Sequence, residues 1–146
     1  MLPQIDTAAV DPPRNSSRTA KKSRAHVLVV DDDRLLRWAV AETLGDRGYD
    51  VSEAADAKSA LQALATRGAA TDLVLLDLFL PDVSDLRVLN LIRTSAPAIP
   101  VVLMTSFVSP EIVEQAMAAG ARVITKPFDM DTLTALIERT LAARLS

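Results

Sequence analysis

The stretch that most constrains the fold runs from Leu73 to Pro81 and reads Leu-Val-Leu-Leu-Asp-Leu-Phe-Leu-Pro. Its four consecutive aliphatic residues, bounded by Asp72 and Asp77, are too few to cross a membrane. Their unbroken apolar character predicts a strand covered on both faces, as in a parallel sheet. Asp77 then ends a buried strand, at the edge where open α/β sheets bind ligands. On this stretch alone, an aspartate that only ends the strand is an equally good interpretation.

The rest of the chain alternates short apolar strands with amphipathic helical stretches, which is typical of βαβ units. The predicted strands cover residues 26–31, 49–54, 73–77, 101–104 and 122–125. The expected helix caps are Asp33, Asp56, Ser109 and Asp129, and the expected helix stops are Gly48, Gly68 and Gly120. A third helix is expected over about residues 84–95. Right-handed crossovers and two covered faces favour an α/β fold: a five-stranded parallel sheet of flavodoxin-like order 2-1-3-4-5, with five helices in a three-layer sandwich.

Composition and charge divide the 146 residues into two parts. Residues 1–24 hold five basic and two acidic residues among prolines and serines, which predicts a disordered basic tail. Residues 25–146 hold eleven basic and seventeen acidic residues and form the expected folded domain. The sequence has no cysteine, no apolar run of membrane length and no signal-peptide pattern. We therefore expect a cytoplasmic protein without a membrane partner.

The predicted strand order brings polar residues together, because strands one, three, four and five end at the same edge of the sheet. The residues at these ends are Asp31, Asp32, Asp77, Thr105, Ser106 and Lys126. Neighbouring carboxylates repel one another unless a cation neutralises them. All-oxygen ligands with room for water favour Mg2+ over Ca2+. The sequence thus predicts a magnesium site at this edge.

Four segments carry a resemblance to a known family. They are Val-Val-Asp-Asp-Asp (29–33), Leu-Leu-Asp-Leu-Phe-Leu-Pro (75–81), Met-Thr-Ser (104–106) and Lys-Pro-Phe (126–128). In this order, at the predicted strand ends, they resemble the receiver domain of bacterial two-component response regulators. The resemblance covers residues 25 to 143. Leu36-Arg37-Trp38 further resembles the receivers of NtrC-type regulators.

The resemblance implies roles for the residues that match the family's motifs. Asp77 would be the phosphoacceptor, Thr105 the switch hydroxyl, and Lys126 the partner of the phosphoryl group, placed by a cis Lys126–Pro127 bond. The implied ligands of Mg2+ are Asp31, Asp32, Asp77 and the backbone carbonyl of Phe79. Such a domain catalyses its own phosphorylation and slow dephosphorylation, and we do not expect it to be an enzyme in the usual sense.

The resemblance also implies partners. The phosphoryl group would come from a sensor histidine kinase or a histidine phosphotransfer protein. A downstream effector would contact the face of helix four, strand five and helix five, from about Ser109 to Leu145. We expect a monomer or a phosphorylation-dependent dimer that does not itself contact DNA. The chain is expected to act as a stand-alone receiver, with part of a longer transcription regulator as the alternative.

Several positions depart from the family's pattern. Asp85 stands where the family has glycine, so either the turn differs or Asp85 starts the helix. Val123 replaces an aromatic residue that moves with the switch threonine. Phe79 and Phe107 lie where polar side chains of the family can position the hydrolytic water. We expect slow dephosphorylation if the rings flank the water path, and ordinary side-chain packing if they turn away.

Other polar and aromatic residues have simpler interpretations. We expect Asp33 to cap a helix rather than bind metal, Trp38 to lie on the exposed side of helix one, and His26 to be an ordinary surface residue. A flavodoxin-like cofactor module is the alternative from another class, but Asp31-Asp32-Asp33 would repel a cofactor phosphate after strand one. A pseudo-receiver that is never phosphorylated would not need the complete acidic set.

Overall fold

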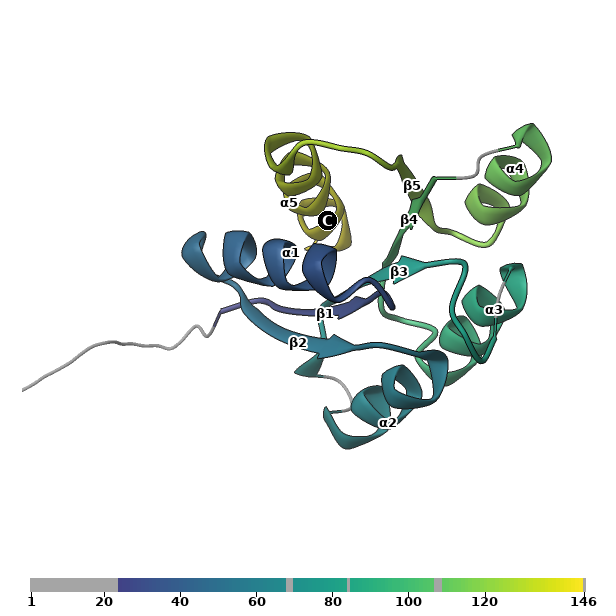
Figure 1. The fold of residues 1–146 in the computed structure, drawn as a ribbon, viewed down its shortest axis with the longest axis horizontal. Helices are drawn as coiled ribbons and strands as arrows, with labels where there is room; N and C mark the ends of the chain where they lie inside the picture. Colours follow the sequence, from purple (N-terminus) through teal and green to yellow (C-terminus); the bar gives the residue numbers. More distant parts are fainter. Residues whose placement is uncertain (1–23, 68–69, 84, 107–108, 146) are drawn as a thin grey trace, which may run out of the picture.

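The computed structural model describes residues 24–67, 70–83, 85–106 and 109–145 (Figure 1). The predicted disordered tail, apart from Arg24, lies outside the described residues, and so do the predicted helix stop Gly68 and the aromatic residue Phe107. None of the helices in the described part is both long and apolar enough to cross a membrane.

The core of the molecule is a sheet of five parallel strands in the order β2-β1-β3-β4-β5, as predicted. The strands are β1 (His26–Val30), β2 (Asp50–Ala54), β3 (Leu73–Asp77), β4 (Val101–Thr105) and β5 (Arg122–Thr125). Asp77 lies opposite Met104, and Thr105 lies opposite Thr125. This register brings the carboxyl ends of β3, β4 and β5 to one edge.

Five helices cover the two faces of the sheet (Figure 1). They are α1 (Arg34–Asp46), α2 (Ala57–Arg67), α3 (Leu86–Ser95), α4 (Pro110–Ala118) and α5 (Met130–Leu145). One buried cluster joins the sheet to α1 and α5 through Val40, Leu44, Leu133 and Ile137. The other joins it to α2, α3 and α4 through residues that include Leu64, Leu89, Ile92 and Ala116. The three-layer prediction is confirmed.

Strand β3 is an unbroken apolar run up to Asp77 because both of its faces are buried. Val74 and Leu76 belong to the cluster under α2 and α3. Leu73 and Leu75 belong to the cluster under α1 and α5. Alternate side chains of a strand point to opposite faces, and both faces of this strand are covered. Every residue of β3 is therefore buried, and Asp77 is carried into the interior at its carboxyl end.

The predicted helix caps are also confirmed. The Asp33 side chain accepts hydrogen bonds from the backbone N–H groups of Leu35 and Leu36. Asp56, Ser109 and Asp129 each accept a hydrogen bond from the backbone N–H three residues later. These bonds satisfy donors that the first turn of a helix leaves without a partner. The Asp33 carboxylate is thus engaged in capping α1.

Two predictions need correction. His26 is not a surface residue: it opens β1, is 5% exposed, and its Nε2 lies 2.8 Å from Ser52 Oγ. Strand β1 is an inner strand, paired with β2 on one side and with β3 on the other. The third helix ends at Ser95 as expected but begins at Leu86, two residues later than expected, because Asp85 has a φ of 61° and a ψ of −159°, which is not a helical conformation. The backbone at Asp85 thus keeps a conformation that suits glycine.

Candidate functional site

Three aspartates meet at the carboxyl edge of the sheet. Asp31 and Asp32 directly follow β1, and Asp77 is the last residue of β3. Each offers one carboxylate oxygen, and these oxygens all lie within 4.8 Å of one another. Asp31 is fully buried, Asp77 is 6% exposed, and Asp32 is exposed to solvent. The cluster therefore has two buried carboxylates and one that faces water.

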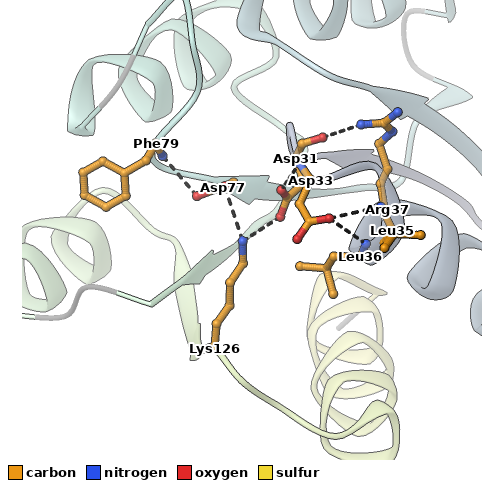
Figure 2. A network of polar contacts seen from close by, with 8 residues as sticks. All are labelled: Asp31, Asp33, Leu35, Leu36, Arg37, Asp77, Phe79 and Lys126. Carbon is orange, nitrogen blue, oxygen red and sulfur yellow. Dashed lines mark hydrogen bonds and ion pairs between the residues drawn. The ribbon is translucent and has the colours of Figure 1, made fainter.

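Lys126 supplies positive charge to this cluster (Figure 2). Its Nζ donates to Asp31 Oδ2 at 2.7 Å and to Asp77 Oδ2 at 3.3 Å. The lysine follows β5, and its backbone N–H donates to the carbonyl of Thr105 at 2.8 Å. The Lys126–Pro127 bond is cis, as predicted. One ammonium group opposes three carboxylates, so the site keeps an excess of negative charge.

Backbone and side-chain donors hold the carboxylates in place. The Asp33 N–H donates to Asp31 Oδ1 at 2.8 Å, and the Phe79 N–H donates to Asp77 Oδ1 at 3.0 Å. Arg37 Nη1 donates to the Asp31 carbonyl at 2.7 Å, while its Nε bonds Glu53 of β2. The sequence reasoning did not find this role of Arg37. A basic residue one helical turn after an acidic cluster is the signal that could have indicated it.

The electrostatics follow from burial and from the excess of carboxylates. Burial raises the pKa of Asp77 above its ordinary value, and the nearby charge of Asp31 acts in the same direction. The Phe79 N–H and Lys126 oppose this shift only in part. Burial by itself would lower the pKa of Lys126, but its hydrogen bonds and attraction to Asp31 and Asp77 outweigh burial and raise it. The lysine is therefore held in its charged form.

Thr105 and Phe79 are placed near this cluster by β4 and by the loop after β3. Thr105 ends β4, next to the strand that carries Asp77, and is buried. Figure 2 shows the ring of Phe79 pointing away from the Asp77 carboxylate, although the backbone of Phe79 contacts it. Of the two interpretations of Phe79, this orientation favours the ring that turns away from the water path. The same two interpretations apply to Phe107, which lies outside the described part of the chain.

The donor set fits the magnesium ion that the fold family implies. Carboxylate oxygens are the hard ligands that Mg2+ prefers, and this ion keeps several waters when few protein ligands hold it. The exposed carboxylate of Asp32 leaves a side of the cluster open to such waters. The negative excess of the cluster would be neutralised by a divalent cation.

A parallel sheet of order 2-1-3-4-5 with five covering helices is the flavodoxin-like arrangement, and CheY-like receiver structures share it with this chain. The family model of the response regulator receiver domain matches residues 27–138, and the chain belongs to this family. This confirms the resemblance of the sequence motifs. The acidic cluster and Lys126 lie at the carboxyl edge within the matched region.

Relatives with similar sequences are longer regulators. The probable transcriptional regulatory protein TcrX of Mycobacterium tuberculosis is 37% identical over 84% of this chain and 54% of its own length. The response regulator protein FleR of Pseudomonas aeruginosa is 37% identical over 83% of this chain and 25% of its own. The DNA-binding transcriptional regulator NtrC of Escherichia coli is 32% identical over 82% and 25%. The chain thus spans about half of TcrX and a quarter of FleR and NtrC.

Solved structures agree with this assignment. The chemotaxis protein CheY4 of Vibrio cholerae superposes with a TM-score of 0.73 at 31% identity, covering 81% of this chain and 99% of that one. NtrX of Brucella abortus superposes with a TM-score of 0.76 at 37% identity, covering 83% of this chain and 28% of that one. The NtrC-type relationship that Leu36-Arg37-Trp38 indicated is supported by the sequence identities of 32% to NtrC and 37% to NtrX.

Proposed function

We propose that residues 25–146 form a signalling receiver domain that accepts a phosphoryl group on Asp77 from a histidine kinase or a histidine phosphotransfer protein. The observation that carries the proposal is the position of Asp77. This carboxylate ends a buried strand, lies beside two other carboxylates, and has the Lys126 ammonium 3.3 Å from its Oδ2. Membership of the receiver family supports it further.

The chemistry follows from these groups. A carboxylate oxygen of Asp77 attacks the phosphorus of phosphohistidine, the phosphorus–nitrogen bond breaks, and the imidazole leaves with the electron pair. Asp77 then carries an acyl phosphate. Lys126 offers a compact positive charge to the phosphoryl oxygens, while its bond to Asp31 keeps it in the site. Mg2+, when bound by Asp31, Asp32, Asp77 and the carbonyl of Phe79, would neutralise charge on the transferred group.

Acetyl phosphate can test this without knowledge of the partner. The full chain is incubated with acetyl phosphate and Mg2+, and its intact mass is measured. Wild type and the control Asp46→Asn, an exposed aspartate of α1, should each gain one phosphoryl group. Asp77→Asn should gain none. A variant Asp77→Asn that is labelled as fully as the wild type would rule out Asp77 as the acceptor.

We propose that the phosphoryl donor docks beside the amino end of α1. Leu35 and Trp38 are 78% and 59% exposed and stand three residues apart on α1, so they lie on one face of the helix and offer a partner an apolar patch. Next to them a cavity of about 300 Å3 is lined by residues that include Leu36, Lys126 and Phe128. Leu35→Ser should slow transfer from a phosphorylated kinase while leaving labelling by acetyl phosphate unchanged. Equal rates from both donors would contradict this docking face.

We propose that the α4–β5–α5 face, about residues 109–145, responds to phosphorylation through Thr105. Helix α4 buries only Ala116 fully, and Met117 is 63% exposed, so little apolar contact fixes α4 on the sheet. A hydroxyl that shifts toward a phosphoryl group can bias such a helix. Amide hydrogen exchange in this face should change on phosphorylation. Unchanged exchange in a fully phosphorylated sample would contradict the proposal. The lack of a response would then be explained by Val123, which stands where the family has an aromatic residue.

The proposal also covers the longer protein, the cellular compartment and the oligomeric state in which the receiver would act. TcrX, FleR and NtrC are named as regulators, and control of transcription would belong to such a longer protein. The receiver would act in the cytoplasm, where phosphohistidine donors operate, as a monomer or a phosphorylation-dependent dimer. Light scattering before and after labelling by acetyl phosphate distinguishes these two states.

A further inference from the structure

A second cavity lies at the opposite edge of the sheet from Asp77. It has a volume of about 290 Å3 and is found where β4 and β5 begin, because Val101 and Arg122 are the first residues of these strands. The ends of α3, α4 and α5 complete its walls. The lining residues are Arg93, Pro97, Ala98, Pro100, Val101, Gly120, Arg122, Thr140, Ala143 and Arg144.

Three arginines from three different elements line this cavity. Arg93 lies near the end of α3, Arg122 starts β5, and Arg144 lies in the last turn of α5. None of the lining residues is acidic. This concentration of positive charge stands out because residues 25–146 hold seventeen acidic and only eleven basic residues. Like charges repel, so three guanidinium groups around one cavity favour an anion between them.

Two of the guanidinium groups are held in place with donors to spare. Within the described residues, Arg93 bonds the Ile99 carbonyl through Nη1 alone, at 3.3 Å. Its Nη2 packs close to Gly120, where an added Cβ would stand only 3.1 Å from it. Gly120 has a φ of +85°, so a side chain at this position would both crowd the Arg93 guanidinium and strain the backbone. Arg144 uses Nη1 alone, for the Asp72 carbonyl at 2.9 Å and Oδ1 at 3.1 Å. A guanidinium has five N–H donors, so most of theirs remain for a ligand.

Arg122 differs from the other two. Its side chain is exposed and, in the part of the chain that the structure describes, makes no hydrogen bond or ion pair. The fork of a guanidinium matches two oxygens of a phosphate, which makes arginine a better phosphate ligand than a point charge would be. An arginine whose side chain has no such anchor can move toward an anion that the other two hold.

The rest of the wall is apolar. Pro97, Pro100, Val101 and Ala143 supply aliphatic surface beside the three arginines. Ligand cavities commonly measure about 300–1,000 Å3 and combine apolar walls with a few polar groups. A cavity of about 290 Å3 is just at the lower limit of that range and suits a mononucleotide better than a larger cofactor. Its arginines match phosphates, and its aliphatic wall matches a flat ring.

From this juxtaposition we infer that the cavity is a binding site for a small phosphorylated metabolite with two adjacent phosphates and a ring, of the class of a nucleoside diphosphate. The inference does not depend on the proposed phosphorylation of Asp77, which lies at the other edge of the sheet. Binding here involves charge pairing and ring contact, and no bond is made or broken.

The experiment uses the full chain in EDTA, without Mg2+, so that the acidic edge repels phosphate. Titration calorimetry is run with ADP and, separately, with inorganic pyrophosphate, and the Gly120 amide is followed by NMR. The variant is Arg122→Gln, and the matched control is Arg87→Gln, an exposed arginine of α3 outside the cavity. Both remove one positive charge, and circular dichroism checks the fold.

The expected result is saturable one-to-one binding of ADP that shifts the Gly120 amide. Arg122→Gln should weaken it about tenfold, as loss of a charged hydrogen-bonding partner would, while Arg87→Gln leaves it unchanged. Absence of saturable binding, equal weakening by both variants, or no effect of Arg122→Gln would overturn the proposal. Pyrophosphate binding as tightly as ADP would overturn the assignment of a ring-bearing ligand.

Discussion

The acidic cluster at one edge of the sheet and the arginine-lined cavity at the other carry opposite charges, and they would meet a phosphate group in different ways. At the carboxyl edge, three carboxylates face one ammonium group. At the amino edge, three arginines line a cavity with no acidic residue in its lining, although Arg144 also pairs with Asp72. An acidic site repels phosphate until a cation enters, so the proposed phosphorylation there would be conditional on a metal. A basic cavity attracts phosphate directly, so the inferred binding at the amino edge would need no metal.

The side chains of the two edges also differ in stiffness. The carboxylates sit on short side chains next to strand ends, and backbone N–H groups fix Asp31 and Asp77. The arginines have long side chains, of which Arg122 is exposed. A short, anchored nucleophile is suited to in-line attack, because reaction requires positioning within a fraction of an ångström. Long side chains adapt to a ligand and tolerate small changes in its shape.

The largest expected effect comes from removing the single ammonium group of the carboxyl edge. Lys126→Ala should slow labelling by acetyl phosphate about a hundredfold, the usual cost of losing one fixed group that stabilises transferred charge. Lys58→Ala, which removes an exposed lysine of α2, is the control. The measurement is intact mass against time. A rate within twofold of wild type would mean that Lys126 contributes to the folded structure but not to the phosphorylation rate.

The next effect concerns Asp85, in the loop that follows β3. Its φ of 61° and ψ of −159° lie in a region that only glycine enters readily. Asp85→Gly should raise the free energy of unfolding by about 1–2 kcal/mol, through relief of this strain. Asp85→Ala should give no such gain. Urea denaturation measures both, and a destabilised glycine variant would show that the Asp85 side chain contributes contacts that outweigh the strain.

Metal binding should distinguish the two edges directly. Mg2+ at about ten times its Kd should raise the free energy of unfolding by about 1.4 kcal/mol. Asp32→Asn should remove most of this gain, whereas Arg122→Gln, at the other edge, should keep it. Trp38 is the single tryptophan and lies on α1, so its fluorescence can follow both binding and unfolding. A gain that survives in Asp32→Asn would place the ion elsewhere.

A smaller effect is expected from His26, at the amino edge. Burial lowers the pKa of His26, as does the charge of Arg67, while Asp50 and Asp72 act the other way. The unfolded chain, with a histidine pKa of about 6.5, therefore binds more protons than the folded one just below that pH. Stability should fall as pH drops below about 6.5.

The histidine variant isolates this effect. His26 is the only histidine of the chain, and His26→Gln can keep a polar contact with Ser52 without titrating. Its denaturation midpoint should depend less steeply on pH in this window than that of the wild type. An identical slope in both proteins would assign the pH dependence to the carboxylates.

Much of the fold and site was predictable because the relevant signals are local. The apolar run of β3 indicates a strand covered on both faces. Helix caps are also local, because the side chains of Asp33, Ser109 and Asp129 accept hydrogen bonds from backbone N–H groups only two or three residues later. Once the strand order is fixed, Asp77 and Lys126 have to approach one another. The contact of Lys126 Nζ with both Asp31 and Asp77 then follows from topology.

The features that escaped prediction depend on tertiary placement. His26 is polar and near the start of the folded region, but pairing with β2 and β3 buries it. The bond from Arg37 to the Asp31 carbonyl depends on how α1 leaves β1. The cavity at the amino edge unites Arg93, Arg122 and Arg144, which are spread over about fifty residues without a common pattern.

The central claim is that Asp77 alone among the clustered carboxylates accepts the phosphoryl group. The most direct measurement treats the chain labelled by acetyl phosphate with borohydride, which reduces an acyl phosphate to an alcohol, and locates the reduced residue by peptide mass spectrometry. The account predicts reduction at position 77 and at neither Asp31 nor Asp32. Reduction at either of these two, with Asp77 unmodified, would contradict it.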